Sequence, residues 1–166
     1  MTEHRISLRA PTEDDRDTFV RLFGDPEFMV FHSHGAMHLD AANARFDRML
    51  RMADELHCSK RPVVERATGE LVGYAGFDVM EFEGAQWLEL GYRLIRSARG
   101  KGYATEACAT ILAQASLLFG GEVLGVVDPA NSASKRVLDK VGFRYWKRAT
   151  IGDDEVDVYH RELDGW

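Results

Sequence analysis

Hydrophobic and polar residues follow two different periods along this chain. Ile6 and Leu8 alternate with polar neighbours, which predicts a half-buried strand. Between Ala104 and Phe119, apolar residues recur every three to four positions, which predicts one long helix with an apolar stripe. The other strands and helices are predicted from the same two periods, and Gly, Pro and Asp residues mark the turns between them. Strands are expected at 6–8, 61–66, 71–80, 87–95, 123–127, 143–150 and 156–162, and helices at 12–23, 40–53, 103–119 and 131–141.

The predicted order of elements, βααβββαβαββ, is typical of an α+β or mixed α/β domain. The three consecutive strands that start near residue 61 are expected to form an antiparallel meander. Thr12 and Asp40 are the expected caps of the first two helices. No repeat or linker divides the sequence, and 166 residues is an ordinary domain size. We therefore expect residues 1–166 to form a single domain.

The overall charge narrows the choice of partners. The sequence has 27 acidic and 21 basic residues, a formal net charge of −6. Proteins that bind a nucleic-acid backbone usually carry a basic surplus, so we expect a small molecule or a protein as partner. Cys58 and Cys108 make neither a disulfide framework nor a zinc motif. Without a signal peptide or a long apolar run, the sequence predicts a soluble cytoplasmic protein with no membrane partner.

The loop before the long helix is the candidate phosphate-binding element. A strand leads into Arg99-Gly100-Lys101-Gly102, and the helix follows directly. The first amides of a helix lack partners and lie at its positive end, and glycines let a ligand approach the backbone. This is the chemistry of a pyrophosphate site. The P-loop motif fails because Gly102 follows Lys101, and the dinucleotide motif fails because it would need glycine at Thr105. A solvated glycine-rich turn remains the alternative.

The spacing Arg99-x-x-Gly102-x-Ala104 matches the [Q/R]-x-x-G-x-[G/A] motif of the GCN5-related N-acetyltransferase (GNAT) superfamily. The sequence resembles in particular the group that includes the RimJ and RimL N-terminal acetyltransferases. The segments that carry the resemblance are 6–9, 12–15, 25–27, 89–94, 100–107 and 128–143. They occur in the right order and span most of the chain.

The resemblance implies acetyl-CoA as co-substrate and acetyl transfer to an amine. The acceptor would be a protein N-terminus or a small amine such as a polyamine, an aminoglycoside or an amino-acid derivative. The fold would be a mixed, mostly antiparallel sheet flanked by about four helices, with the pantetheine arm in a gap between strands four and five. Homodimers are common in the group, and no metal is expected. A non-catalytic acyl-CoA-binding or regulatory module and a different nucleotide-binding protein are the alternatives.

The resemblance also assigns CoA contacts by position. The backbone of Tyr92 and Leu94 would pair with the pantetheine amides. The backbone amides expected at the pyrophosphate are those of Arg99, Gly100, Lys101, Gly102, Tyr103, Ala104 and Thr105. Asn131 and Ser134 would lie on the other side of the arm; three residues apart at a helix start, both can face one ligand. Helix capping is the alternative for these two side chains.

The four basic residues of this stretch give it a local positive charge despite the acidic chain. We expect them near the phosphates of CoA. They are Arg93, Arg96, Arg99 and Lys101.

Glu89 is the candidate general base, because an amine must lose a proton before it attacks a thioester. Its carboxylate interrupts the run 87–90, which otherwise has the pattern of an interior strand. A buried carboxylate is costly without a partner or a function. A salt-bridged or outward-facing glutamate is the alternative. Ser134 is the candidate proton donor, as proposed for some RimL-like enzymes, because Leu138 stands where many superfamily members have a tyrosine acid.

Two further segments are candidates for contact with the acceptor. His32, His34 and His38 lie in a region that usually borders the acceptor site in this fold, with a plain surface loop as the alternative. Gly35 interrupts any regular spacing of these histidines, and no carboxylate or thiol completes a set of ligands, which argues against a metal site. The acidic run that includes Asp153, Asp154, Glu155 and Asp157 would attract a cationic acceptor, or would form a solvated turn.

Overall fold

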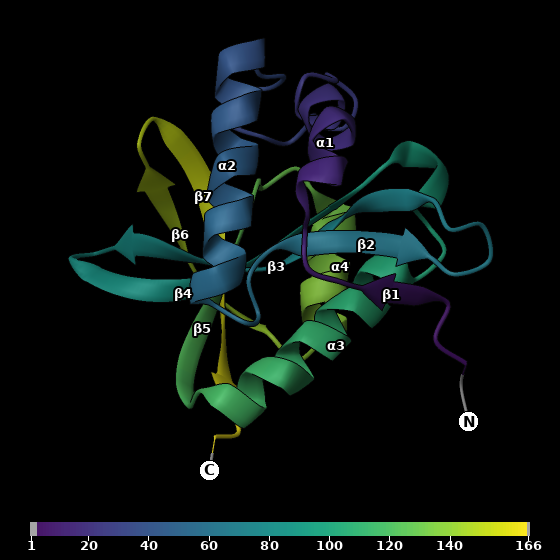
Figure 1. Cartoon of the computed structure of the whole chain (residues 1–166). Helices are drawn as coiled ribbons and strands as arrows, with labels where there is room; N and C mark the ends of the chain where they lie inside the picture. The colour runs from purple at the N-terminus through teal and green to yellow at the C-terminus, as the bar shows by residue number, and fades with distance from the viewer. Residues whose placement is uncertain (1–2, 166) are drawn as a thin grey trace.

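The computed structural model describes residues 3–165 and has the predicted order of strands and α-helices. Figure 1 shows a central sheet with helices on both of its faces. The strands are β1 (Ile6–Leu8), β2 (Arg61–Glu65), β3 (Leu71–Phe82), β4 (Ala85–Leu94), β5 (Gly121–Val127), β6 (Arg144–Ile151) and β7 (Asp154–Leu163). The helices are α1 (Arg16–Phe23), α2 (Leu39–Glu55), α3 (Tyr103–Leu118) and α4 (Ser132–Lys140), with short 3-10 turns η1 (Glu13–Asp15) and η2 (Arg96–Ala98).

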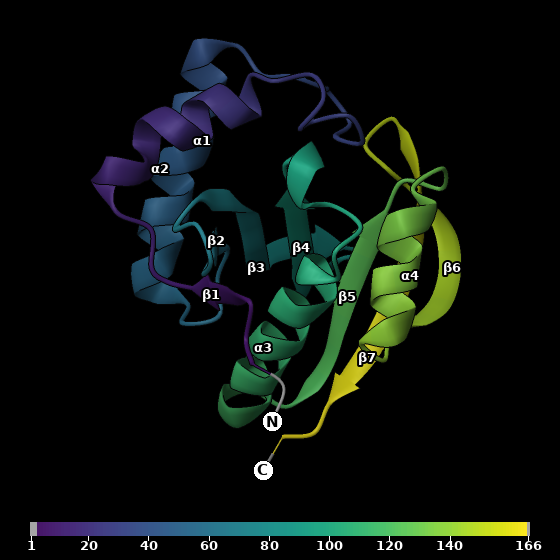
Figure 2. The ribbon, with the colours of Figure 1, turned by 90° about the vertical axis from the view of Figure 1, so that its right-hand side faces the viewer.

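The sheet is mixed, with the strand order β1-β2-β3-β4-β5-β7-β6. All neighbouring strands are antiparallel except β4 and β5, which run parallel. These two strands pair only at Glu89 and Leu124. Beyond this point they diverge, so the backbone of residues 90–94 has no strand partner on the β5 side (Figure 2). The predicted fold class and the gap between strands four and five are confirmed.

Side chains alternate between the two faces of the sheet because strand residues point to opposite sides in turn. Tyr74 of β3 packs with α1 and α2, whereas Phe77 packs with α3 and α4. Antiparallel register places Glu89 opposite Asp78, and Arg93 opposite Tyr74. Glu89 and Arg93 therefore lie on the face of β4 that carries α1 and α2.

The apolar stripe of α3 packs against the sheet as its spacing predicts. Its buried residues include Ala107, Cys108, Ile111, Leu112 and Ala115. Small residues let the helix approach closely, and each fully buried large apolar side chain contributes roughly 1.5–3 kcal/mol. Cys108 is part of this core, as its position on the stripe predicts.

The expected helix caps are partly wrong. At the first helix, Asp15 accepts a hydrogen bond from the Thr12 backbone N–H at 2.9 Å and pairs with Arg9 at 2.7 Å. A 3-10 turn, η1, precedes α1. The second helix begins at Leu39 after His38, so Asp40 lies inside the first turn rather than at the cap. A carboxylate there still interacts favourably with the positive end of the helix.

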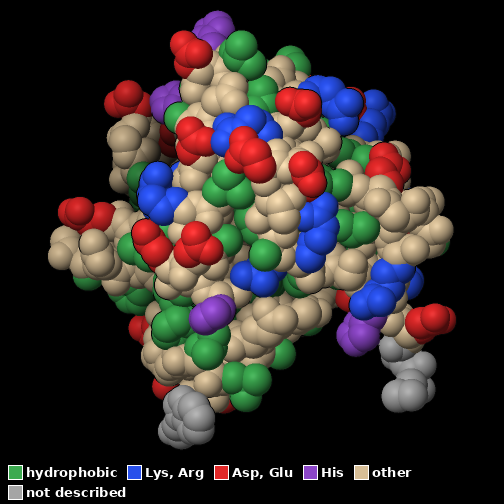
Figure 3. Space-filling view, viewed as in Figure 1, with side chains coloured by type: hydrophobic (Ala, Val, Ile, Leu, Met, Phe, Trp, Pro, Cys, Tyr) green, Lys and Arg blue, Asp and Glu red, His purple; other side chains and the backbone are tan. Residues whose placement is uncertain are grey.

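The surface in the view of Figure 1 carries both signs of charge. Figure 3 shows Lys and Arg side chains interspersed with Asp and Glu over this face, rather than one continuous basic patch. In the part of the chain that the structure describes, no helix is long and apolar enough to cross a membrane.

Candidate active site

A large cavity opens where β4 and β5 separate. Its volume is about 1240 Å³, and it connects three parts of the molecule. One part is the glycine loop with the start of α4, the second is Glu89 with the β3 and α2 side chains beside it, and the third is the β6–β7 hairpin. The cavity therefore joins the predicted phosphate loop to the predicted base.

The backbone of the glycine loop is open to a ligand. Gly100 and Gly102 have φ angles of 75° and 81°, a region that residues with a Cβ rarely adopt. Around Gly100, nothing lies within 4 Å of the position that a Cβ would occupy. Gly102 precedes the first residue of α3, and the first helical bond runs from the Glu106 N–H to its carbonyl. The amides before Glu106 can therefore bind an anion, which fits a pyrophosphate.

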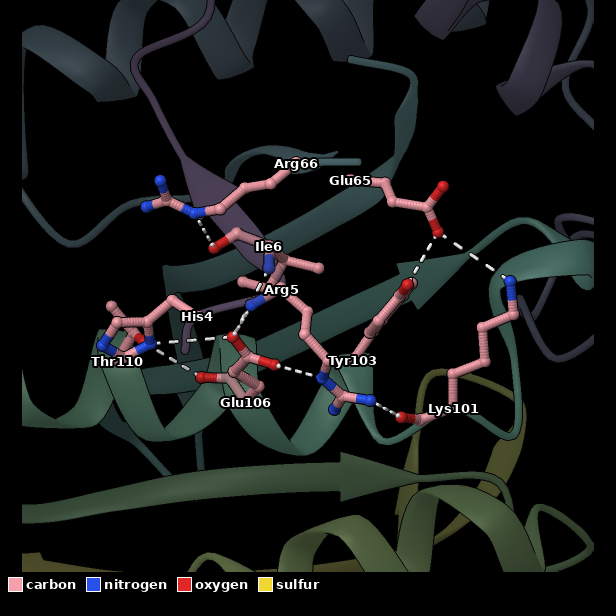
Figure 4. A network of polar contacts seen from close by, with 9 residues as sticks. All are labelled: His4, Arg5, Ile6, Glu65, Arg66, Lys101, Tyr103, Glu106 and Thr110. Carbon is pink, nitrogen blue, oxygen red and sulfur yellow. Dashed lines mark hydrogen bonds and ion pairs between the residues drawn. The ribbon is translucent and has the colours of Figure 1, made fainter. Parts of the chain in front are cut away.

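A polar network anchors this loop and α3 to the first strand (Figure 4). The carboxylate of Glu106 accepts the Arg5 backbone N–H at 2.8 Å, and Nη1 of Arg5 donates to the Lys101 carbonyl at 2.7 Å. The Tyr103 hydroxyl donates to Glu65 at 2.7 Å. These contacts fix the N-terminus of α3 relative to β1 and β2, so the open amides keep their direction.

The basic residues of the loop do not gather at one point, contrary to the expectation from their sequence. Arg96 pairs with Glu27 at 3.0 Å. Nζ of Lys101 lies 3.8 Å from Glu65, and Lys101 is not among the residues that line the cavity (Figure 4). Arg99 lines the cavity, but Nε is held by the Leu94 carbonyl at 3.0 Å.

Arg136 and Lys140 of α4 also line the cavity and bring further positive charge to it. Sequence reasoning missed these two residues. Their spacing of four on one helix face was the signal that could have found them.

Asn131 and Ser134 lie at the start of α4 and line the cavity. The Asn131 side chain accepts the Ser134 N–H at 3.1 Å, so it caps the helix. The Tyr92 hydroxyl lies 2.9 Å from the Ser134 carbonyl and 2.8 Å from its Oγ. A carbonyl only accepts, so Tyr92 donates to it and the Ser134 hydroxyl donates to Tyr92. Only the backbone of Tyr92 was expected here; the side chain was missed.

Burial raises the pKa of Tyr92 well above its ordinary value. Its hydroxyl therefore stays protonated throughout the neutral range. A proton from Ser134 can reach a ligand only when the serine hydroxyl rotates away from Tyr92.

Glu89 is half-buried and lines the cavity at the point where β4 and β5 part. Burial raises the pKa of its carboxyl group, and the nearby Asp78 acts in the same direction, while the positive charge of Lys60 lowers it. Asp78 is itself paired with Arg48 at 2.7 Å. Within residues 3–165 Glu89 makes no ion pair. Its carboxylate therefore has the position and the raised pKa that a general base needs.

Three cationic side chains lie on the β3 side of Glu89 around the hydroxyl of Tyr74. Arg45 and Arg93 donate to this hydroxyl at 3.2 and 3.3 Å, and Lys60 lies over the ring. Sequence reasoning missed this cluster, because its members come from three separate segments. Only Arg93 was singled out, and it lies at Tyr74 rather than in the glycine loop.

The histidine loop contributes to the cavity in part. His32 and His34 line it, whereas His38 precedes α2. Nη1 of Arg45 lies 3.1 Å from Nε2 of His32. Burial and then Arg45 lower the pKa of His32 to about 4, so the ring is neutral at pH 7. Over residues 3–165, no three His, Cys, Asp or Glu side chains are grouped to hold a metal ion.

The acidic residues of the β6–β7 hairpin lie in two different environments, the cavity and a buried ion-pair cluster. Asp153, Asp154 and Glu155 line the cavity. Asp157 instead is buried and paired with Lys135 at 2.8 Å and Arg148 at 2.9 Å, so the idea that it attracts an acceptor is wrong.

Several solved structures have the same fold. An acetyltransferase from Agrobacterium tumefaciens str. C58 superimposes with a TM-score of 0.82 at 23% identity, covering 97% of this chain and 92% of that one. RimL, a ribosomal L7/L12 α-N-protein acetyltransferase in complex with coenzyme A, gives a TM-score of 0.77 at 14% identity, over 98% and 96% of the two chains. The fold is that of the acetyltransferases.

Comparison of sequences identifies the family, which the fold alone does not. The model of the family described as "Acetyltransferase (GNAT) domain" matches residues 5–144. YkkB of Bacillus subtilis (strain 168) is 31% identical over 165 residues, covering 95% of this chain and 92% of that protein. The N-acetyltransferase p20 of Bacillus licheniformis is 26% identical over 166 residues, covering 93% and 90%. The chain belongs to the GNAT acetyltransferase family, in its RimJ/RimL-like group.

Proposed function

We propose that this protein transfers an acetyl group from acetyl-CoA directly to a primary amine, either a protein N-terminus or a small amine. One observation supports this most strongly. A half-buried carboxylate with a raised pKa, Glu89, lies in the same cavity as the open amides of the glycine loop. The gap that opens where β4 and β5 diverge connects the Glu89 carboxylate to the glycine loop.

The residues of the cavity fit CoA. The amides from Arg99 to Thr105 bind the pyrophosphate, since they lie at the positive end of α3. The unpaired edge of β4 offers the backbone of Tyr92 and Leu94 to the pantetheine amides. Asn131 and Ser134 lie across the gap from this edge. When bound, acetyl-CoA supplies an activated acetyl thioester beside Glu89.

The acceptor arrives as an ammonium ion, and Glu89 takes its proton. A carboxylate whose pKa is raised toward neutrality is a better base than an exposed one, because its proton affinity is closer to that of the amine. The neutral amine nitrogen then forms a bond to the acetyl carbon, the C–S bond breaks, and the second proton of the nitrogen passes to the departing thiolate, which leaves an amide and the CoA thiol. Direct transfer requires no protein nucleophile. This agrees with the two cysteines, Cys58 and Cys108, which are buried in the core with raised thiol pKa values.

Charge develops at two atoms in this reaction. A backbone N–H on the free edge of β4 stabilises the carbonyl oxygen, as donors of an oxyanion hole do. The departing thiolate receives a hydrogen bond from the Ser134 hydroxyl once this hydroxyl turns away from Tyr92, while Tyr92 still donates to the Ser134 carbonyl and holds the start of α4 in place. A thiolate is a fair leaving group, so this contribution is smaller than that of the base.

Glu89→Gln tests the proposal. Loss of a general base lowers the rate by roughly 10²–10⁴-fold, so kcat/KM for CoA release with an amine acceptor is expected to fall in this range. CoA binding measured by calorimetry is expected to stay unchanged. Glu81→Gln is the matched control, since Glu81 is exposed on β3 outside the cavity. Full activity of the Glu89 variant would exclude this residue as the base.

The pH profile provides a second test. Because the pKa of Glu89 is raised, its base form is lost at a higher pH than for an exposed glutamate. The wild-type kcat/KM is therefore expected to fall as pH drops through that raised pKa, and Glu89→Gln to lack this limb. A raised carboxyl pKa costs stability above the ordinary pKa. The variant is therefore expected to be at least as stable as the wild type at pH 7, and thermal unfolding of both proteins checks that a lost rate is not due to unfolding.

A further inference from the structure

Three cations converge on one phenol in the part of the cavity on the α1 and α2 side of the sheet. Arg45 comes from α2, Lys60 from the residues just before β2, and Arg93 from β4. Nη2 of Arg45 and Nε of Arg93 donate to the Tyr74 hydroxyl at 3.2 and 3.3 Å. Nζ of Lys60 lies 5.8 Å from the ring centre. All three cationic side chains are half-buried and line the cavity.

The hydrogen-bond partners of these cations are neutral groups. Besides Tyr74, Arg45 contacts Nε2 of His32 at 3.1 Å, and Nη1 of Arg93 donates to a backbone carbonyl at 3.3 Å. Throughout residues 3–165, none of the three side chains forms an ion pair with a carboxylate. Half-buried positive charge with neutral partners favours an anionic ligand, because charge-assisted hydrogen bonds are the strong ones.

Tyr74 and His32 bring no negative charge to the cluster, while the carboxylates of Glu89 and Asp78 interact with Lys60 from the neighbouring part of the sheet. Burial raises the pKa of Tyr74, but Arg45, Lys60 and Arg93 outweigh it and bring the pKa to about 8. The phenol is therefore mostly uncharged at pH 7. His32 is neutral as well, since its pKa is about 4. Neither of these two groups therefore offsets the positive charge of the cluster at neutral pH.

The cluster lies beside the proposed base. Glu89, Gly91 and Arg93 share one face of β4, and at about 3.3 Å per residue the first and last are roughly 13 Å apart along the strand. Lys60 reaches between them because Gly91 has no side chain. A Cβ at Gly91 would lie 2.7 Å from Cε and 3.0 Å from Nζ of Lys60, and 3.7 Å from Oε2 of Glu89.

We propose that the acceptor amine also carries an anionic group, a carboxylate or a phosphate, and that Arg45, Lys60 and Arg93 bind this group while the amine lies at Glu89. This inference rests on the proposed function. Asp153 and Asp154 line the same cavity from the β6–β7 hairpin. A zwitterionic acceptor therefore finds the Glu89 carboxylate for its ammonium group and the cluster for its anionic group, whereas a polyamine would bring positive charge against the three cations.

Matched acceptors test the inference. CoA release is measured with saturating acetyl-CoA for α- and ω-amino acids against their amides, for phosphoethanolamine against ethanolamine, and for spermidine. A lost charge-assisted contact changes affinity by about ten- to hundredfold. The anionic member of a pair is therefore expected to have a kcat/KM higher by about this factor. If the ratio of kcat/KM values is larger for the amino acids over their amides, the anionic group is a carboxylate. If it is larger for phosphoethanolamine over ethanolamine, the group is a phosphate.

Charge-removing variants assign the preference to the cluster. Lys60→Gln and Arg45→Gln are each expected to lower the ratio between an anionic acceptor and its uncharged partner by about tenfold. Lys60 makes no side-chain hydrogen bond in the described part of the chain, so its variant disturbs the fold least. Arg51→Gln is the matched control, because Arg51 is exposed on the same helix as Arg45 and lies outside the cavity.

The two proposals fail in different ways. Equal kcat/KM values for acids and amides, or a preference that Lys60→Gln and Arg45→Gln leave unchanged, overturn the anionic acceptor while amine acetylation stands. If no amine releases CoA, the proposed function fails, and binding of inorganic phosphate to the CoA-loaded protein tests the cluster alone. Saturable binding that Lys60→Gln weakens supports the cluster as an anion site; its absence in calorimetry overturns it.

Discussion

At the scale of single residues, the alternation of side chains along β4 separates the chemistry into two faces. Glu89 and Arg93 face the side of α2, where the acceptor is proposed to bind. Leu90 and Tyr92 face the side of α3 and α4, where Tyr92 contacts Ser134. One strand thus presents the proposed base and the proposed acceptor contact on one side, and the proposed support for the leaving group on the other.

Ser134 and Tyr92 are expected to act as one unit. Ser134→Ala removes a donor to the departing thiolate, and Tyr92→Phe removes the group that holds this donor, so each is expected to lower kcat by roughly tenfold. Residues that work as a unit are non-additive, so the double variant is expected to be no slower than either single one. Single-turnover rates with saturating acetyl-CoA measure this.

Measuring the affinity for CoA shows whether Tyr92 and Ser134 contribute to catalysis or only to CoA binding. Phenylalanine fills the space of Tyr92, so CoA affinity is expected to change only slightly in Tyr92→Phe. If the double variant instead shows the product of the two single effects, the residues act independently. A pure rise in KM for acetyl-CoA would reduce Ser134 to a binding contact.

At the scale of elements, the contact between α4 and β5 explains the leucine at position 138. Leu138 is fully buried and packs over Gly125, where a Cβ would lie 2.8 Å from its Cδ2. The leucine therefore occupies space that only glycine on β5 leaves free. The position that carries a tyrosine acid in many relatives is here a packing position that fixes α4 against the sheet.

Gly125→Ala is expected to destabilise the protein by about 1–2 kcal/mol, since overpacking a buried contact forces side chains out of their rotamers. Gly120→Ala is the control. Its Cβ would meet its nearest neighbour at 3.6 Å, an ordinary contact. Denaturant unfolding of both variants measures the difference. Equal stability of the two would mean that Leu138 repacks freely.

Elements with strong local signals could be predicted from the sequence. The stripe of α3 and the glycine loop each lie within one continuous segment, so periodicity and motif spacing were enough to find them. The Tyr74 cluster could not be found in this way, because Arg45, Lys60 and Arg93 become neighbours only when α2, β3 and β4 pack together. The contact of Tyr92 with Ser134 likewise bridges β4 and α4.

Charge patterns were the least reliable guide for the same reason. Arg96 lies just before the glycine loop and Lys101 lies within it, but their side chains pair with Glu27 and Glu65. Long arginine and lysine side chains can point to either side of a strand or loop, and their partners decide the direction. Composition alone showed a net charge of −6 and could not show a cationic cluster inside the cavity.

At the scale of the whole molecule, the sheet consists of two parts that meet at one point. β1 to β4 form the first part and β5, β7 and β6 the second, with Glu89 and Leu124 as the single paired position between them. The helices α3 and α4 cover this junction, and they share a core with Leu90 and Val127. A ligand between β4 and β5 would contact both parts and tie them together.

CoA is therefore expected to stabilise the whole molecule and, unlike its phosphates alone, to protect the junction between the two parts of the sheet. At a concentration of about 100 times Kd, a ligand that binds only the folded state adds roughly 2.7 kcal/mol. Adenosine 3′,5′-bisphosphate, which lacks the pantetheine arm, is the control ligand.

Thermal unfolding and proteolysis of the β4–β5 junction compare CoA with this control, each ligand at the same multiple of its own Kd. Equal thermal stabilisation follows from mass action, but only CoA is expected to slow cleavage at the junction. Equal protection from proteolysis by both would mean that the arm does not bridge the two parts of the sheet.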